Sequence, residues 1–294
     1  MLFTQLRGRG LSRCFPPLCR LLLFHGDLGE CRDFFGYLVD LLVKASKYDH
    51  RLHDLYACLN RSDEPSHPHG YGYFIALTYG DVIEHMYYNR SHKPIYLDKH
   101  GVYMAKYILD HWEHDVYGLL HTRKASTGEP IGILHTHPFM VRDGVRLVVL
   151  VHNGSFDKAR LCMSMGINES ICNSISDSYV ATLYIGYRLR DVGDPINVLS
   201  ELLDEYVGYD KASIVGLAYI VEGRIKLYYG VNIRYDCHSP CGEMYRRYYE
   251  PYIIRYRDCI ALVSSTIHDL LVTNTSYRES ITVHKLPYNT IGEL

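Results

Sequence analysis

The chain has 294 residues, of which 47% are hydrophobic, so it carries enough apolar side chain for a substantial buried core. Its 31 lysines and arginines nearly balance its 33 aspartates and glutamates. That balance gives no electrostatic reason to expect nucleic acid or an anionic membrane as a partner. No apolar run approaches the ~20 residues that cross a bilayer. We therefore expect neither a nucleic-acid partner nor a membrane partner.

Residues 1–18 differ from the rest of the chain. They contain three arginines, no acidic residue and the pair Pro16-Pro17. They lack the long apolar segment of a signal peptide, and an arginine-rich, acid-poor composition would also suit an organelle transit segment. We interpret residues 1–18 as a leader, a propeptide or a mis-assigned start, and residues 19–294 as one continuous domain.

The predicted elements begin with a short buried strand from Cys19 to Phe24. An amphipathic helix follows over residues 33–45, where apolar side chains recur on one helical face. Residues 70–79 predict a strand punctuated by glycine, and residues 102–109 are ambiguous. Residues 146–151 form a β-branched run that stops at His-Asn-Gly, a sequence typical of a turn.

The second half predicts a helix over residues 178–187 and another that begins at Asp194-Pro195. A β-hairpin is predicted over residues 213–229, with its turn at Glu222-Gly223. Further strands are predicted over residues 259–264 and 270–273. Strands and helices in this order favour an α+β fold with a mixed or antiparallel sheet over an alternating doubly wound fold.

The nine cysteines are odd in number and irregular in spacing, and no secretory leader precedes them. We therefore expect no disulfide framework, and we expect a reducing, cytoplasmic location. Another class of protein is a metal-binding protein that uses Cys237, His238 and Cys241. A single C-x₃-C lacks the second pair of ligands that zinc sites normally show, so this signal is weak.

Short polar segments, far apart in sequence, carry the candidate chemistry. Taken alone, each has an ordinary explanation, such as a hairpin turn or a solvated strand end. In this order and spacing they resemble class II glutamine amidotransferases of the N-terminal-nucleophile hydrolase superfamily, in a stand-alone form. The resemblance implies a four-layer αββα sandwich. The matching segments are Cys19, residues 67–72 (HPHGYG), residues 121–128 (HTRKASTG), residues 137–139 (HPF), residues 151–154 (VHNG) and Ser176-Asp177.

Cys19 is the candidate nucleophile. A thiolate attacks, and a free thiol has a pKa of ~8.5, so a base must lie nearby at neutral pH. An α-amino group, with a pKa of ~8, supplies that base if Cys19 begins the mature chain. That requires either initiation at the codon of Leu18 or proteolytic loss of residues 1–18. The alternative is that Cys19 is a buried strand cysteine without a chemical role.

The resemblance also assigns roles to other residues. It implies that the Asn153 amide and the Gly154 N–H form the oxyanion hole, that Arg123 binds the substrate α-carboxylate and that Asp177 binds the α-ammonium group. The structural alternatives are a hairpin turn at residues 153–154, a surface ion pair for Arg123 and a helix N-cap for Asp177. Further residues are implied in the substrate loop, Ser126 and Thr127, and behind the site as supports, His67, Gly70 and His137.

The function implied is hydrolysis of a γ-glutamyl amide, either glutamine or another γ-glutamyl compound, through a thioester on Cys19. Ammonia or an amine is released, no metal or organic cofactor is needed, and a separate synthase would accept ammonia. The alternative is a catalytically inactive binding or regulatory module. The chain departs from the family pattern at His69, at Ser126-Thr127 and at Tyr179. These departures concern binding of the α-amino group and of the leaving group.

Overall fold

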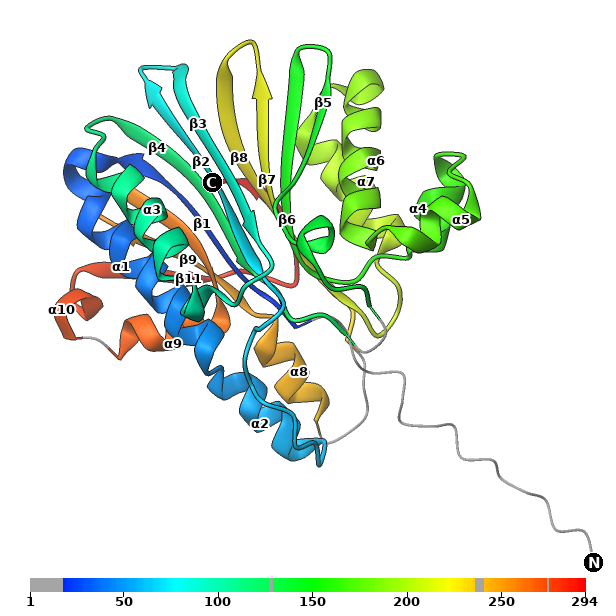
Figure 1. Ribbon diagram of the computed structural model, residues 1–294, viewed down its shortest axis with the longest axis horizontal. Helices are drawn as coiled ribbons and strands as arrows, with labels where there is room; N and C mark the ends of the chain where they lie inside the picture. The colour runs from blue at the N-terminus through cyan, green and yellow to red at the C-terminus, as the bar shows by residue number, and fades with distance from the viewer. Residues whose placement is uncertain (1–17, 127–128, 236–240, 274) are drawn as a thin grey trace, which may run out of the picture.

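The strands of the computed structural model, which describes residues 18–126, 129–235, 241–273 and 275–294, form two antiparallel sheets (Figure 1). The larger sheet has the order β11-β9-β10-β1-β4-β2-β3 and the smaller sheet the order β12-β8-β7-β6-β5. The larger sheet comprises β1 (Arg20–Asp27), β2 (Tyr71–Tyr79), β3 (Val82–Ser91), β4 (Asp115–Thr122), β9 (Pro251–Tyr256), β10 (Cys259–Ser264) and β11 (Ile281–Lys285). The smaller sheet comprises β5 (Phe139–Asp143), β6 (Arg146–Gly154), β7 (Ala212–Val221), β8 (Arg224–Ile233) and β12 (Asn289–Glu293).

Helices cover the outer face of each sheet and the end of the molecule beside them. The larger sheet is covered by α1 (Leu28–Lys47), α3 (Lys99–Asp110), α9 (Ser265–Val272) and the short α10 (Thr275–Arg278). The smaller sheet is covered by α4 (Lys158–Ser164), α5 (Glu169–Ser174), α6 (Asp177–Val192) and α7 (Pro195–Tyr206). At the lower end in Figure 1 lie α2 (His50–Cys58) and α8 (Gly242–Tyr248).

Three apolar cores separate these layers, and β1 shows how one strand serves two of them. Leu21 and Leu23 belong to the core between the two sheets, whereas Leu22 and Phe24 belong to the core beneath α1. Successive side chains of a strand point to opposite faces, so an almost uninterrupted apolar run is what a strand buried on both faces requires. The four-layer αββα sandwich is therefore confirmed.

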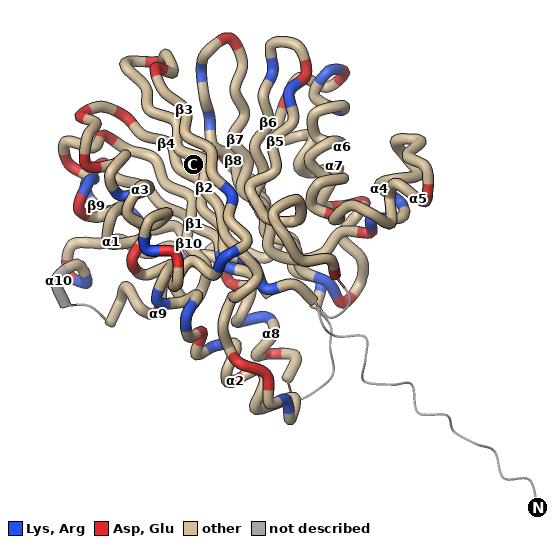
Figure 2. The backbone as a smooth tube through the Cα atoms, viewed as in Figure 1, with Lys and Arg blue, Asp and Glu red and all other residues tan. Residues whose placement is uncertain are grey.

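Charged residues lie mainly outside these cores. Figure 2 shows lysine and arginine interspersed with aspartate and glutamate along helices and loops. The central strands of the two sheets carry few charged residues of either sign. In the part of the chain that the structure describes, no helix has the length and apolar character needed to cross a membrane.

Most predicted elements are confirmed. The helix at Asp194-Pro195 is α7, whose first free amide, that of Ile196, donates to the Asp194 carboxylate at 3.0 Å. The hairpin turn at Glu222-Gly223 has positive φ at both residues, 51° and 76°, as a type I′ turn needs. The ambiguous residues 102–109 lie in the helix α3.

The strand predicted over residues 270–273 is wrong, because these residues end the helix α9. A short apolar run has the same composition in a buried strand and in a buried helix, so its period does not separate the two. Ile267 and Leu271, four residues apart, both pack in the core beneath α1, which is the spacing of one helical face.

The expectation of no disulfide framework is also wrong. Disulfides join Cys31 to Cys259, Cys58 to Cys241 and Cys162 to Cys172, with Cα–Cα distances of 5.6, 5.9 and 6.1 Å. Two of the bridges close loops of 228 and 183 residues, which spacing along the sequence does not reveal. Cys14 and Cys237 lie outside the described residues, and Cys19 is free. Disulfides persist mainly in oxidising compartments, so the absence of a disulfide framework no longer supports the cytoplasmic location, which stays a prediction.

Replacing both Cys31 and Cys259 by alanine should lower the free energy of unfolding by about 2–5 kcal/mol, since this bridge constrains the unfolded chain over a long loop. The matched control replaces Cys162 and Cys172, whose bridge closes a loop of only 10 residues and should stabilise less. Urea unfolding of both variants measures the difference. A larger loss in the control would contradict the expectation.

Candidate active site

The candidate site lies where three strands end at the same edge of the two sheets. Arg20 at the start of β1 pairs with Thr122 at the end of β4, so Cys19 and Arg123 leave the larger sheet side by side. The end of β6 reaches the same place from the smaller sheet, because the Cys19 N–H donates to the Asn153 Oδ1 at 3.0 Å. The two sheets therefore bring together residues that are 134 positions apart.

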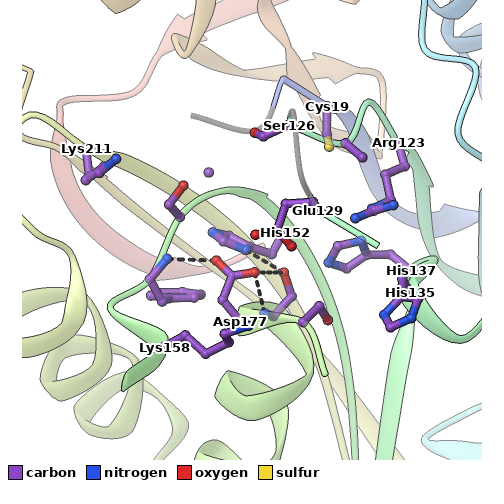
Figure 3. Close-up of a pocket in the computed structure, with 16 residues that line it drawn as sticks. Cys19, Arg123, Ser126, Glu129, His135, His137, His152, Lys158, Asp177 and Lys211 are labelled. Atoms are coloured by element: carbon purple, nitrogen blue, oxygen red, sulfur yellow. Dashed lines mark hydrogen bonds between the residues drawn. The ribbon is translucent and has the colours of Figure 1, made fainter. Parts of the chain in front are cut away.

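A cavity of about 280 Å³ opens at this edge (Figure 3). Its size lies near the lower end of small-molecule sites. Among the predicted site residues, those that line it are Cys19, Arg123, Ser126, His137, Gly154 and Asp177. Residues to which the sequence reasoning gave no role also line it, namely Ala125, Glu129, His135, His152, Ser155, Phe156, Lys158, Ser176, Ser178 and Lys211. Thr127 lies outside the described residues.

Asn153 presents its amide in a defined orientation. Its Oδ1 accepts the Cys19 N–H, so its Nδ2 group points elsewhere, and that group is buried with no hydrogen-bond partner in the described chain. A buried donor without a partner is costly, and such groups recur where a ligand completes the hydrogen bond. Asn153 therefore holds a spare N–H donor while its Oδ1 binds the Cys19 backbone, although its side chain does not line the cavity.

Gly154 is fixed by close approach of the backbone. Its φ is 142°, and a Cβ there would lie 2.0 Å from the carbonyl oxygen of Ala212, so only glycine fits. Gly154 is the last residue of β6 and pairs with Ser213 of β7. The hairpin-turn interpretation of residues 153–154 is therefore wrong, because the strand runs through both residues.

The Cys19 thiol is buried, with 3% of the residue exposed. Burial raises its pKa to about 11, although the nearby Arg123 and Arg20 act in the opposite direction. With Leu18 attached, the nitrogen of Cys19 is a peptide nitrogen and has no basicity to offset this. Leu18 is itself 6% exposed and belongs to the core between the sheets. In the intact chain, the thiol is therefore protonated at neutral pH.

A buried ion pair supports the backbone at Cys19. Arg20 is fully buried, and its Nε donates to the Asp49 Oδ2 at 2.6 Å. The same guanidinium donates to the Cys19 carbonyl at 3.3 Å. Burial alone would raise the pKa of Asp49, but the Arg20 charge and a hydrogen bond from His67 hold that pKa well below its usual range. The position of Cys19 is thus tied to a charge pair that has no access to water.

This network explains the predicted support residues. The His67 ring contacts Asp49 at 2.9 Å and lies outside the cavity. The Gly70 carbonyl accepts the Arg123 N–H at 2.8 Å and so fixes the backbone of that residue. Arg20 and Asp49 were missed. The available signal was the placement of Asp49 just before α2, which it caps by accepting the Leu52 N–H at 3.1 Å.

Arg123 and Asp177 both line the cavity. Their hydrogen-bond partners differ from those expected for a surface ion pair and for a helix N-cap. Arg123 is 6% exposed and donates to the Pro130 carbonyl at 2.9 Å, and it forms no ion pair with any described residue. The surface ion pair is therefore wrong. The N-cap of α6 is Ser176, whereas the Asp177 carboxylate accepts the N–H groups of Phe156 and Ser178 at 2.9 and 2.7 Å.

Three buried histidines, His121, His137 and His152, lie near one another, and two of them, His137 and His152, line the cavity. The His121 ring lies 4.1 Å from that of His137, and His152 contacts the hydroxyls of Ser178 and Ser213 at 2.8 and 3.0 Å. Burial lowers the pKa of all three, to about 3 for His152. Both ring nitrogens of His137 are buried and lack a partner in the described chain. His137 therefore lines the cavity itself, as a neutral ring.

No protein-family model matches the chain, and no curated protein matches its sequence. Among solved structures, the allosteric regulatory enzyme of purine biosynthesis is similar over 92% of this chain and 49% of that chain, at 13% identity and a TM-score of 0.49. The present chain thus spans about half the length of that structure. A predicted glutamine amidotransferase from Pseudomonas aeruginosa is similar over 96% of this chain and 90% of that one, at 13% identity and a TM-score of 0.32.

Replacing Asp49 by alanine should lower the free energy of unfolding by about 3–5 kcal/mol, because it leaves the Arg20 charge buried without a partner. The matched control is Asp40→Ala, which breaks the half-exposed Lys106–Asp40 pair at 2.8 Å and should cost less than about 1 kcal/mol. Urea unfolding measures both. Equal losses of unfolding free energy in the two variants would show that burial does not determine how much these ion pairs stabilise the fold.

Stability should fall as the pH drops below about 6.5. His121, His137 and His152 have lowered pKa values in the fold, so the unfolded chain takes up their protons first. Each contributes a loss of ~1.4 kcal/mol per pH unit between the unfolded pKa near 6.5 and the folded pKa. The test is the free energy of unfolding at pH 7, 6 and 5, with His137→Gln giving a shallower slope. A flat profile would contradict the burial of neutral rings.

Proposed function

We propose that this chain is a class II glutamine amidotransferase-type enzyme that hydrolyses a γ-glutamyl amide, with Cys19 as its N-terminal nucleophile. One observation carries the proposal: a thiol, a guanidinium and a carboxylate line one cavity, and a spare amide donor belongs to Asn153, which accepts the Cys19 N–H at 3.0 Å. The thiol of Cys19 supplies the nucleophile, and the Asn153 Nδ2 supplies the donor. Arg123 and Asp177 complement the two ends of an amino acid, since one binds a carboxylate and the other an ammonium group.

The first step needs a base. When Cys19 is the first residue, its nitrogen becomes an α-amine with a pKa of ~8, on the same residue as the thiol. The amine takes the Sγ proton, directly or through one water, and the thiolate attacks the γ-carbonyl carbon of the substrate. The new S–C bond forms as the carbonyl electron pair moves onto oxygen.

The oxyanion is then stabilised by the Asn153 Nδ2 group and the Gly154 N–H. Donors held in place before the reaction cost no reorganisation, and losing one lowers the rate by about 10²–10³-fold. The C–N bond breaks as the amine returns its proton to the leaving nitrogen. Water hydrolyses the remaining γ-glutamyl thioester, which yields glutamate and the free thiol.

Other parts of the proposal concern partners and cofactors. If glutamine is the substrate, the ammonia would pass to a separate synthase. No cofactor enters the mechanism. Among the described residues, no group of three or more histidine, cysteine and acidic side chains is arranged to hold a metal. Of the alternative metal ligands, Cys237 and His238 lie outside the described residues, and Cys241 is bonded to Cys58.

The test is protein that begins at Cys19, compared with the full chain. The Cys19-first protein should hydrolyse γ-glutamyl amides and should be labelled at Cys19 by an electrophilic glutamine analogue, because only it carries the basic amine. Mass spectrometry locates the label, and glutamate release measures turnover. Full-length chain that keeps residues 1–18 should do neither.

Two variants of the Cys19-first protein complete this test. Cys19→Ala should abolish labelling and turnover. Asn153→Ala should keep the fold, as judged by circular dichroism, and lower kcat by about 10²–10³-fold. If the Cys19-first protein neither reacts with the analogue nor releases glutamate, the chain is an inactive binding or regulatory module, and the proposal fails.

A further inference from the structure

The charges around the cavity exceed what glutamine needs. Arg123, Lys158 and Lys211 supply three cations, and Glu129 and Asp177 supply two anions, while the lining histidines His135, His137 and His152 have lowered pKa values. The zwitterionic end of a γ-glutamyl substrate engages one cation and one anion, Arg123 and Asp177. A neutral amide with ammonia as its leaving group gives the remaining lysines nothing to bind.

Lys158 already has a task within the protein. It is the first residue of α4, and its ammonium donates to the Ile175 carbonyl at 3.1 Å. Burial raises the pKa of Asp177, and the Lys158 charge acts in the opposite direction. Lys158 therefore helps to keep the Asp177 carboxylate ionised.

Lys211 has no such task. Its ammonium forms no hydrogen bond or ion pair with any residue in the described ranges, although its side chain lines the cavity and is half-buried. Lys211 comes directly before β7, where the Ala212 carbonyl accepts the Ser155 N–H at 3.0 Å and Ser213 pairs with Gly154. It is thus placed next to the proposed oxyanion donors by the strand register.

Lys211 and Arg123 lie on opposite sides of the cavity, as Figure 3 shows. They come from different sheets, Arg123 from the end of β4 and Lys211 from the start of β7. A substrate whose α-carboxylate lies at Arg123 and whose γ-carbonyl lies at Cys19 would direct its leaving group away from Arg123. The side that receives the leaving group is then the side of Lys211.

We propose that Lys211 forms a subsite for a carboxylate on the leaving group, so that the substrate is a γ-glutamyl amino acid or γ-glutamyl peptide; this inference rests on the proposed function. Such a substrate carries two carboxylates and one ammonium group. Three cations and two anions around the cavity complement that charge of −1, whereas glutamine has no net charge. An ammonium facing a carboxylate in a half-buried cavity forms a charge-assisted hydrogen bond.

The experiment uses protein that begins at Cys19, which keeps every described helix and strand because the first of them begins at Arg20. Its substrates are γ-glutamylglycine and γ-glutamylglycinamide, which are nearly the same size but differ in the charge of the leaving group, with glutamine as a third substrate. We expect kcat/KM to be ~10-fold higher for γ-glutamylglycine than for γ-glutamylglycinamide, the size expected for one charge-assisted contact.

In Lys211→Gln, that ratio should fall to near one. The matched control is Lys47→Gln, an exposed lysine at the end of α1, which should keep the wild-type ratio. Glutamine turnover with equal rates on the two glycine compounds would overturn the inference and leave the proposed function standing. A preference for γ-glutamylglycine that survives Lys211→Gln would also overturn it. No turnover of any of the three substrates would overturn both.

Discussion

The candidate site depends on one charge pair that water does not reach. Arg20 and Asp49 are both fully buried, and each carries hydrogen bonds from several elements. Taking two charges out of water is expensive, and the cost is met only when geometry and hydrogen bonding are nearly complete. A pair that has met this condition has few alternative arrangements. The residue next to Arg20 in the chain is Cys19, so the candidate nucleophile inherits that rigidity.

The rest of the site is assembled across the two sheets. Cys19 and Arg123 come from the larger sheet, while Asn153, Gly154 and Asp177 come from β6 and α6 on the smaller one. The apolar core between the sheets therefore sets the relative position of the two halves of the site. That core is close-packed, and a shift of one sheet against the other would disturb many side chains at once. Leu21 and Leu23, which lie in that core, follow Cys19 by two and four residues in the chain.

The sequence predicted elements whose local pattern and tertiary environment agree. The β-hairpin at residues 222–223 and the helix at Asp194 are examples, since turn chemistry and capping act over a few residues. The predicted residues that line the cavity came from resemblance to a family, not from any periodic pattern in the sequence. Two kinds of feature could not be predicted. Disulfide partners up to 228 residues apart are set by the topology, and Lys211 reaches the cavity only through its strand register.

The same limit explains α9 and Arg20. The mostly apolar residues 270–273 would suit either a strand or a helix, and packing against α1 determines that they are helical. An arginine inside an apolar strand, flanked by Cys19 and Leu21, gives no sign by itself that it is buried with a partner 29 residues away. Tertiary contacts therefore determine the conformation of residues 270–273 and the burial of Arg20, which local sequence does not reveal. Arg20 is also the residue that supports the candidate nucleophile.

The Cys58–Cys241 bridge connects the end of α2 to the residue before α8. Asp49 caps the start of α2, and Tyr248 ends α8 with its ring 3.7 Å from the Arg20 guanidinium. The bridge thus joins the two helices that contact the charge pair, while the proposed function needs a reduced thiol at Cys19. Redox conditions therefore act on this protein in two opposite ways. A reductant strong enough to break the Cys58–Cys241 disulfide loosens the helices that support Cys19. An oxidant that keeps the disulfide formed can also oxidise the Cys19 thiol. If Cys19 acts as we propose, the active protein carries a disulfide at Cys58–Cys241 and a free thiol at Cys19 at the same time.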